Sequence, residues 1–462
     1  MNRIVPIVLA VALFMEHMDS TVIATSLPAI AADIGTSPIA LKLALTSYYV
    51  ALAIFIPVSG RMADRFGAKL VFRAAIGVFV LGSLACATAG SLGGFVAARF
   101  LQGLGGAMMT PVGRLLLVRA VPRSDLVSAM AWFTIPALIG PLVGPPIGGA
   151  ITTFAHWRYI FVINVPIGLI GIALATRFLP KVEKLAGVAF DTPGFLLSGL
   201  ACAGIVFGCS VISLPALPPW VGAAMTVLGL ASALAYVGHA RRTADPLLRL
   251  SLLRILTFRS ALVGGTLFRM GSGAVPFLLP LMLQLGFGYS AFQCGLITCV
   301  GIGGALLMKF LAKPMLRQFG FRTTLIGTAV LTGVLTAALA LLHPGVPVAT
   351  VLVLLLAGGF FRSLFFTSVN VLAFADVPNA NAGDATAMLA AGQQMSIALG
   401  VAFAGFVLEA GIYVTGTAEP TIAVYSIAFA LVGLISALSA LSYWPLAADA
   451  GAEVSGRHMP AE

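Results

Sequence analysis

The sequence predicts an all-α integral membrane protein whose helices cross the bilayer fourteen times. Of its 462 residues, 60% are hydrophobic and only 9% are charged. A soluble domain is ordinarily about 45 to 50% apolar and about 25% charged, so this chain has too few polar groups to cover a soluble surface. Two further observations support the fold class: the length of the apolar runs, and the uneven distribution of Lys and Arg between the loops.

The apolar runs have the length of transmembrane helices. A helix rises about 1.5 Å per residue and must cross about 30 Å of hydrocarbon, which takes about 20 residues. The runs are continuously apolar, whereas a barrel strand alternates over about ten residues. The first run contains Glu16, His17 and Asp19 and lacks a cleavage pattern, so we expect a span rather than a signal peptide. The fourteen predicted spans are 4–27, 41–60, 70–90, 92–113, 127–151, 159–179, 194–214, 220–238, 260–284, 291–311, 323–342, 348–370, 384–408 and 420–445.

The basic residues predict the orientation. Of the 26 Lys and Arg, 20 fall on one side of the predicted membrane, and the loops of the opposite side hold only Lys42 and Arg158. Because basic residues stay cytoplasmic, we expect both termini in the cytoplasm and the chain in the cell inner (plasma) membrane. The net charge of +11 is then explained by the basic loops that set the membrane topology, and no nucleic-acid partner is expected.

A repeat divides the chain into two halves. Phe66, Gly67 and Lys69 recur 253 residues later as Phe319, Gly320 and Arg322. Spans one to six then correspond to spans nine to fourteen, and two such halves suit rocking around a site at the membrane midplane. The predicted organisation is a six-helix half at 1–180, an inserted helix pair with its cytoplasmic linker at 181–259, a second six-helix half at 260–446, and a cytoplasmic tail at 447–462. No segment is long enough for a soluble domain, so we expect a transporter.

Two carboxyl groups lie deep inside the first span. Glu16 and Asp19 are three residues apart and share a helix face. A charged carboxylate at that depth is costly unless it is paired, protonated or in contact with water. Burial and a neighbouring like charge both favour the protonated form, so the two groups are expected to exchange protons as a coupled pair. The alternative is a protonated residue with a structural hydrogen bond.

The loop after the second span reads Gly-Arg-Met-Ala-Asp-Arg-Phe-Gly-Ala-Lys. Gly60 and Gly67 permit a tight turn, and Asp64 lies among Arg65, Lys69 and other cations, with which it can pair. Such pairs can hold one side of a transporter closed. From spacing alone, an ordinary basic loop is an equal alternative.

These residues resemble a known family. The loop is similar to the signature GxLADRxGxK of the major facilitator superfamily, with Met62 in place of Leu. Residues 98–103, which include Arg99, resemble the family motif whose Arg is implicated in proton transfer. Residues 140–149 resemble the antiporter motif, and residues 14–28 resemble the span-one motif of the fourteen-span drug:proton antiporters of the EmrB/QacA type. Residues 105–114 resemble the MdtD-type branch.

The resemblance implies a major facilitator fold and a proton-coupled antiporter that exports small organic compounds, of the multidrug efflux type. It implies that Asp19, Glu16 and Arg99 couple protons, and that Gly60, Asp64, Arg65, Gly67 and Lys69 form the gating loop. Ala24 stands where many relatives carry Asn, which removes a polar partner from span one. Ala131 stands where the long form of the antiporter motif has Gly, so the resemblance does not rest on that end of the motif.

The antiporter motif also has a physical interpretation. Gly140, Gly144 and Gly148 are spaced by four and form one smooth stripe, which lets another helix approach closely. Pro145 and its neighbouring prolines bend a helix, and Gly149 adds a second small face. We expect a pivot at a close-packed seam, with simple small-residue packing as the alternative.

The predicted substrate cavity takes its candidates from polar residues within the spans: Gln102, Arg269 and Arg362. Four intramembrane arginines exceed two intramembrane acids, so the alternative cargo is an anionic metabolite such as an organic acid or its metal chelate. Glu409 is interpreted as a charge at the outer membrane boundary, with a role in cation recognition as the alternative.

The sequence favours neither an enzyme nor a cofactor protein. The five cysteines lie in apolar runs without metal-ligand spacing, and His17, His239 and His343 have no Asp at i+4 that could complete a catalytic cluster. No cofactor or metal is expected. The expected partners are a small-molecule substrate, protons and the lipid bilayer, for a monomeric chain.

Overall fold

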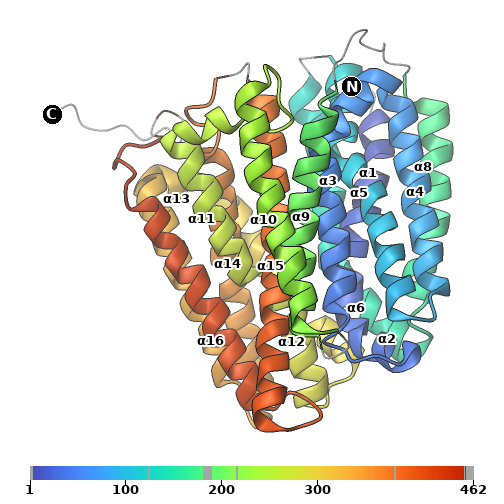
Figure 1. Cartoon of the computed structure of the whole chain (residues 1–462), viewed down its shortest axis with the longest axis vertical. Coiled ribbons are helices and arrows are strands. Elements are labelled where there is room, and N and C mark those ends of the chain that lie inside the picture. Colours follow the sequence, from blue (N-terminus) through green and yellow to red (C-terminus); the bar gives the residue numbers. More distant parts are fainter. Residues whose placement is uncertain are drawn as a thin grey trace.

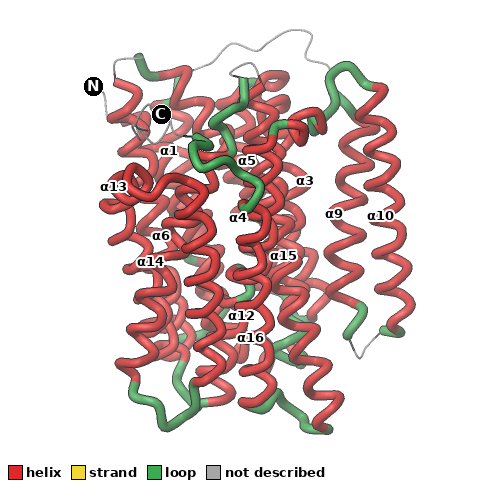
Figure 2. The backbone as a smooth tube through the Cα atoms, turned by 90° about the vertical axis from the view of Figure 1, so that its left-hand side faces the viewer, coloured by secondary structure: helices red, strands yellow, loops and turns green. Residues whose placement is uncertain are grey.

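The computed structural model describes residues 4–122, 125–180, 190–214, 217–378, 381–451 and 453. All regular elements within these ranges are helical (Figures 1 and 2). Predicted boundaries that fall at 181–189, and most of the predicted tail at 447–462, lie outside the described residues.

The helices follow the predicted runs closely. The first part contains α1 (Ile4–Val22), η1 (Ile23–Ser26), α2 (Leu27–Ile34), α3 (Lys42–Phe66), α4 (Ala68–Thr88), α5 (Leu92–Ala120), α6 (Leu126–Phe154), α7 (Tyr159–Val162) and α8 (Asn164–Phe178). The middle part contains α9 (Thr192–Val211), α10 (Pro219–Arg242) and η3 (Leu250–Arg254). The last part contains α11 (Leu256–Ser272), α12 (Val275–Leu281), η4 (Met282–Gly286), α13 (Ala291–Ala338), η5 (Leu339–Leu341), α14 (Val348–Leu372), α15 (Ala382–Thr415), α16 (Ile422–Leu438) and η7 (Ser439–Tyr443).

Twelve helical stretches among the described residues are long and apolar enough to cross a membrane, so the protein is a multi-pass membrane protein. One of these stretches, Ala291–Leu341, covers two predicted spans at once. The 29-residue α5 is not among the twelve.

The repeat places a glycine at the same kind of break in both halves. Gly67 separates α3 from α4 and has φ 96°. Its counterpart Gly320 has φ 71° and ψ 171° and interrupts the helical backbone inside α13. Residues with a side chain rarely adopt these angles, which explains why glycine stands at both positions.

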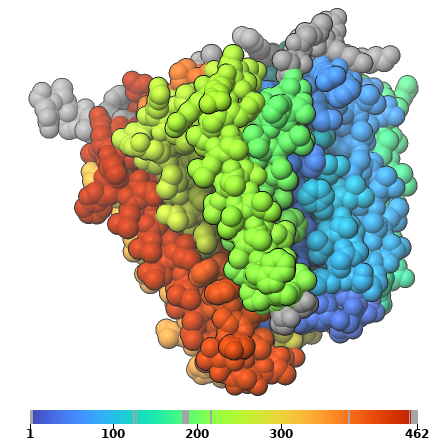
Figure 3. Space-filling model, viewed as in Figure 1, coloured from blue at the N-terminus to red at the C-terminus, as the bar shows by residue number. Residues whose placement is uncertain are grey.

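The first and last parts form two bundles that lie side by side (Figure 1). They meet along two seams, where α6 packs on α13 and α3 packs on α15. The middle part covers the second seam: α9 contacts both α3 and α15, while α10 packs mainly on α9. Figure 3 shows this helix pair across the front of the molecule, and Figure 2 shows it at the edge of the bundle.

The two ends of the bundle differ in how the halves are joined. We call the end where α1 begins and η7 ends the terminal side (top of Figure 1), and the opposite end the far side. On the far side, Gln284 donates to the carbonyl of Thr25 across the boundary at 3.0 Å, and the amide of Phe292 donates to Thr153 at 3.1 Å. The far side is therefore closed by direct contacts between the halves.

Asp191 holds the middle part together on the terminal side. Its carboxylate accepts hydrogen bonds from the amide of Gly194 at 3.0 Å, from the amide of Leu247 at 2.9 Å and from His239 at 2.7 Å. Asp191 therefore caps the first turn of α9 and fixes the linker after α10. Sequence spacing around His239 does not reveal this partner, because Asp191 lies 48 residues away.

Asp191→Ala is expected to lower the free energy of unfolding by about 0.5–2 kcal/mol through loss of the cap, and to leave transport activity in place. Burial favours the uncharged acid, but the bonds from Gly194, Leu247 and His239 outweigh it, so the pKa of Asp191 lies below its ordinary value. The stabilisation is therefore present at neutral pH and is lost below about pH 4. Thermal unfolding in detergent at pH 7, compared with Gly238→Ala at an uncrowded glycine, measures the effect.

Candidate functional site: a buried polar network beside a cationic cavity

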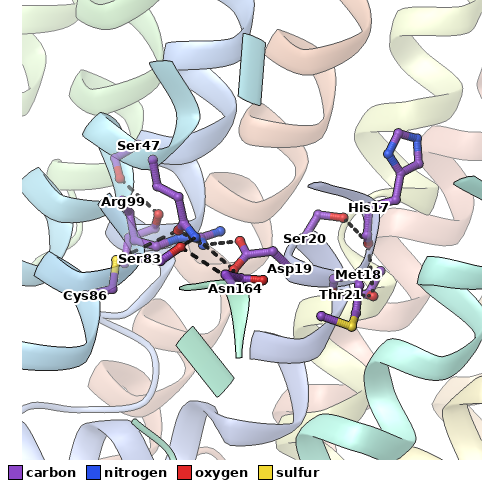
Figure 4. A network of polar contacts seen from close by, with 12 residues as sticks. His17, Met18, Asp19, Ser20, Thr21, Ser47, Ser83, Cys86, Arg99 and Asn164 are labelled. Atoms are coloured by element: carbon purple, nitrogen blue, oxygen red, sulfur yellow. Dashed lines mark hydrogen bonds and ion pairs between the residues drawn. The ribbon is translucent and has the colours of Figure 1, made fainter. Parts of the chain in front are cut away.

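Helix α1 presents different side chains to its two faces. Figure 4 shows Asp19 pointing toward Arg99 and Asn164, inside the first half. His17 points away from that group, and together with Ser20 and Thr21 it lines a cavity between the halves. The predicted proton-coupling residue and the cavity therefore lie on opposite faces of one helix.

Asp19 is the centre of a buried hydrogen-bond network. Its side chain is 0% exposed, and Arg99 of α5 donates to Oδ2 at 2.7 Å. Gln102 of α5 and Asn164 of α8 donate to Oδ1 at 2.8 Å and 2.7 Å. Gln102 also donates to Ser83 of α4 at 2.7 Å and accepts from Arg99 at 2.5 Å. Helices α1, α4, α5 and α8 thus contribute to one network, in which α5 and α8 supply the direct donors to the carboxylate.

The network balances one negative charge with one positive charge. The Arg99 guanidinium lies 4.3 Å from the ring centre of Tyr48 and is 1% exposed, so it too has no access to solvent. In such surroundings an unpaired charge is costly. Asp19 can be neutral only when it holds a proton, and when charged it needs Arg99. Loss of either charge would therefore leave the other one buried without a partner.

Glu16 lies apart from this network. Thr110 of α5 donates to its Oε2 at 2.7 Å, and its side chain is almost fully buried. Within the described residues Glu16 forms no ion pair, in contrast to Asp19. The two carboxyl groups predicted as a pair therefore have separate partners.

The cavity has a volume of about 640 Å³ and lies between the two halves. Its lining comes from α1, α3, α6, α11, α12, α13, α14 and α15, and its polar lining includes Arg269, Lys309 and Arg362. Arg269 lies 4.8 Å from the ring centre of Phe366, and Lys309 donates to Thr367 at 3.2 Å. None of the described lining residues is an Asp or a Glu.

The cavity candidates are placed differently from one another. Arg269 and Arg362 line the cavity, as predicted. The prediction for Gln102 is wrong: it is 0% exposed and bound to Asp19 and Ser83, because α5 turns this face into the first half. Ser272 and Thr332, which also line the cavity, have buried hydroxyl groups without a hydrogen-bond partner among the described residues.

The gating loop is mostly helical. Gly67 makes the predicted turn, but Gly60 lies inside α3, which continues to Phe66, so the expected glycine turn at this position is wrong. Asp64 accepts from Arg119 at the end of α5 at 2.7 Å, and both side chains are partly exposed. Lys69 donates to the carbonyl of Leu179 at 2.5 Å. Arg65 stacks over Phe66, with 5.5 Å to the ring centre.

The antiporter-motif glycines lie against α1. A Cβ atom at Gly140, Gly144 or Gly148 would lie 2.9 Å from the carbonyl of Phe14, 2.1 Å from Thr21 Oγ1 or 2.2 Å from the carbonyl of Val22. The predicted close-packed seam is confirmed, although α6 remains one α-helix through its four prolines. Gly149 faces the other half, where a Cβ atom would lie 2.3 Å from the carbonyl of Ala291, and Pro145 lies close to Gly295.

Several residues of the site were missed in the sequence. Asn164 and Ser83 complete the Asp19 network, and Thr110 binds Glu16. Asn164 is the only amide side chain in the apolar run 159–179, and this is a signal visible in the sequence. Glu409 lies near the end of α15, where a boundary charge is expected, but its side chain is only 9% exposed and is bound to Lys42. No three His, Cys, Asp or Glu side chains of the described residues gather as a metal site.

Solved structures share this fold. A D-xylose-proton symporter has a TM-score of 0.68 at 16% identity, with 96% of this chain and 97% of that chain covered. A POT family transporter in complex with 5-aminolevulinic acid has a TM-score of 0.70 at 16% identity, with 94% of each chain covered. At this identity the similarity establishes the architecture alone.

Sequence comparison identifies the family. Two proteins named "Putative multidrug resistance protein MdtD", from Salmonella heidelberg and Salmonella typhimurium, are each 38% identical over 404 residues, which covers 87% of this chain and 85% of each relative. The family model of the Major Facilitator Superfamily matches residues 9–189 and 261–458. The network and the cavity therefore belong to a transporter rather than an enzyme, and the chain is a member of the Major Facilitator Superfamily, similar to its MdtD-type branch.

Proposed function

We propose that this protein is a proton-coupled antiporter that exports small organic compounds across the cell inner membrane by alternating access. The observation that carries the proposal is the buried ion pair between Asp19 and Arg99. Asp19 belongs to α1, the helix that also lines the cavity. The name of the MdtD relatives supports multidrug-type efflux as the class of activity. Both termini would lie in the cytoplasm, and the protein would work as a monomer with protons and a small-molecule substrate as its partners.

The coupling follows from the charges. When a proton binds Asp19, Arg99 loses its counter-ion and the balance of the network changes. Because α1 carries both Asp19 and the cavity-lining residues His17, Ser20 and Thr21, a shift of this helix changes the cavity. Glu16, held by Thr110, would be a second site for a proton on the same helix. Gly140, Gly144 and Gly148 would let α1 move against α6 without opening a leak.

The energy of one proton is sufficient for useful export. A proton that moves down about 100 mV releases about 2.3 kcal/mol, and one pH unit adds about 1.4 kcal/mol. Together these sustain a cargo gradient of about 500-fold.

We also propose that the chain crosses the membrane fourteen times. The support is that α5 is long and largely buried and carries Arg99, and that Gly320 divides α13 into two segments, each long enough to span. The inserted pair would be α9 and α10, because the two family-model matches leave out 190–260. The remaining proposed boundaries are 1–180 and 260–446 for the halves and 447–462 for the tail.

The proposal is tested in energised inverted vesicles that contain the purified protein. Addition of a lipophilic cation or a neutral drug is expected to collapse part of the pH gradient, and a variant without the Asp19 carboxylate is expected to give no response. Absence of a response to lipophilic cations, neutral drugs and small carboxylates alike would overturn coupled export.

A second candidate function is export of an anionic metabolite, such as an organic acid or its metal chelate. The specific observation is the cavity lining, in which Arg269, Lys309 and Arg362 face no acidic side chain among the described residues. Arg269 has its guanidinium against Phe366 and the carbonyl of Gly265 rather than against a carboxylate. A carboxylate is a ligand that arginine binds with two parallel hydrogen bonds.

If the cargo is anionic, Arg269→Ala and Arg362→Ala are each expected to abolish export of small carboxylates, a loss of about tenfold or more. Arg114→Ala is the matched control, because Arg114 lies in α5 with an exposed side chain and does not line the cavity. Uptake of labelled carboxylates into inverted vesicles measures the effect. Export that persists in both cavity variants would rule out the anionic cargo.

A further inference from the structure

An ion pair connects the two halves on the far side. Lys42 is the first residue of α3, in the first half, and Glu409 lies in α15, in the second half. Lys42 Nζ lies 2.6 Å from Glu409 Oε2 and also donates to Ser213 Oγ at 2.9 Å, just after α9. One ammonium group thus joins the first half, the second half and the inserted pair.

The pair is buried rather than exposed to solvent. The Lys42 side chain is 0% exposed and that of Glu409 is 9% exposed. The apolar residues Ala40, Val211 and Leu214 flank Lys42 and Ser213 in sequence and form a cluster of their own. Because ions far from water interact strongly and are costly to separate, this pair has a larger effect on the position of the halves than a surface pair has.

The second half is shaped to receive the lysine. Gly405 lies one turn before Glu409 on α15, and a Cβ atom there would be 2.3 Å from Lys42 Cδ. The lysine side chain therefore lies along the backbone of α15 and reaches the carboxylate from the other half. This fit exists only while the far ends of α3 and α15 are in contact.

A second ion pair on the far side provides a contrast. Arg158 donates to Asp33 at 2.5 Å, with side chains that are 30% and 36% exposed. Both residues belong to the first half, so this pair is unaffected when the halves separate. Its exposure also makes it a weak contributor, since solvent and salt screen it.

We propose that Lys42, Glu409 and Ser213 form a gate on the far side of the transporter, which we call the far-side gate. The buried ion pair holds the far side closed and breaks when that side opens, and the inserted helices take part because they supply Ser213. Lys42 and Glu409 are thus positioning residues for the transport cycle. The gate rests on the alternating access of the proposed function, but it needs neither an identified cargo nor proton coupling.

The test measures how often the far side opens. Thr25 is buried at the far-side boundary, where its carbonyl accepts from Gln284, and it is not among the residues that line the cavity. In Thr25→Cys the reaction rate with a water-soluble thiol reagent reports opening, in lipid nanodiscs that expose both sides. The rate of the chain without Thr25→Cys is subtracted, because Cys202, Cys209 and Cys299 are partly exposed.

Glu409→Gln and Lys42→Met are each expected to raise the labelling rate about tenfold or more, because each leaves one buried charge or polar group without its partner. The reversed pair, Lys42→Glu with Glu409→Lys, is expected to restore the rate to within about threefold. The apolar pair, Lys42→Met with Glu409→Leu, is expected to label no faster than the parent, since apolar residues replace a buried ion pair without loss.

Two further variants keep the proposal falsifiable if a charge variant fails to fold. Gly405→Ala retains both charges but displaces Lys42, and is expected to raise the rate as well. Arg158→Gln removes the exposed pair within one half and is expected to leave the rate unchanged. Unchanged rates in Glu409→Gln, Lys42→Met and Gly405→Ala, or an equal rise in every variant including the apolar pair, would overturn the gate. Failure of proton coupling leaves this assay unaffected.

Discussion

Asp19→Asn is expected to abolish cargo-driven proton movement in inverted vesicles, with a residual rate about a hundredfold below that of the unmodified protein or lower. Asparagine preserves the size of the side chain and its hydrogen bonds to Gln102 and Asn164, but it has no carboxylate that takes up a proton. The substitution also leaves Arg99, which is 1% exposed, without its counter-ion. An uncompensated buried charge costs about 3–5 kcal/mol, so stability is expected to fall as well.

Two control variants separate coupling from stability. Asp19→Asn with Arg99→Gln removes both charges, and is expected to recover the melting temperature without recovering proton movement. Ser83→Ala removes one hydrogen-bond partner of Gln102 and no charge, and is expected to retain most of the activity. Proton movement at the unmodified rate in Asp19→Asn would show that Asp19 is not the coupling carboxylate.

Gly148→Val is expected to reduce the transport rate about tenfold or more, with a loss of stability of about 1–3 kcal/mol or greater. A Cβ atom at this position would lie 2.2 Å from the carbonyl of Val22 and 2.8 Å from its Cγ2 atom. Helix α1 would have to move away from α6, and Asp19 and the cavity-lining residues would move with it. Initial rates of export, normalised to the amount of folded protein, measure the effect.

Gly77→Val is the matched control for this substitution. Gly77 is a helical glycine of α4, and a Cβ atom there would meet nothing within 4 Å. The two variants share the intrinsic cost of valine in a helix, so their difference reports close packing alone. If both variants transported at the same rate, the seam between α1 and α6 would have no role in transport.

The sequence predicted the helices well because the membrane imposes a strong and simple rule. Every backbone polar group must be satisfied within its own segment, so long apolar runs become helices. The observed α14, for example, begins at Val348 as predicted and ends two residues beyond the predicted 370. The repeat around Gly67 and Gly320 was also visible, since a positive φ favours glycine at this position in both halves.

Side-chain partners were harder to predict, because they depend on how the helices rotate against one another. Gln102 has a polar side chain in a span, but spacing does not tell which neighbour it faces, and it binds Asp19 rather than lining the cavity. Lys42 and Glu409 lie 367 residues apart, and each looks like an ordinary charge at the end of its span. Only the packing of α3 on α15 brings them together.

If cargo and a proton exchange at this protein and Asp19 carries the proton, then binding of cargo releases a proton. The most direct measurement is proton release from purified protein in weakly buffered detergent solution, recorded with a pH indicator as cargo is added. We expect a release that saturates with cargo binding and is absent from Asp19→Asn, while Ser83→Ala releases protons as the unmodified protein does. Cargo binding without proton release from the unmodified protein, or equal release from Asp19→Asn, would rule out Asp19 as the carrier of an exchanged proton.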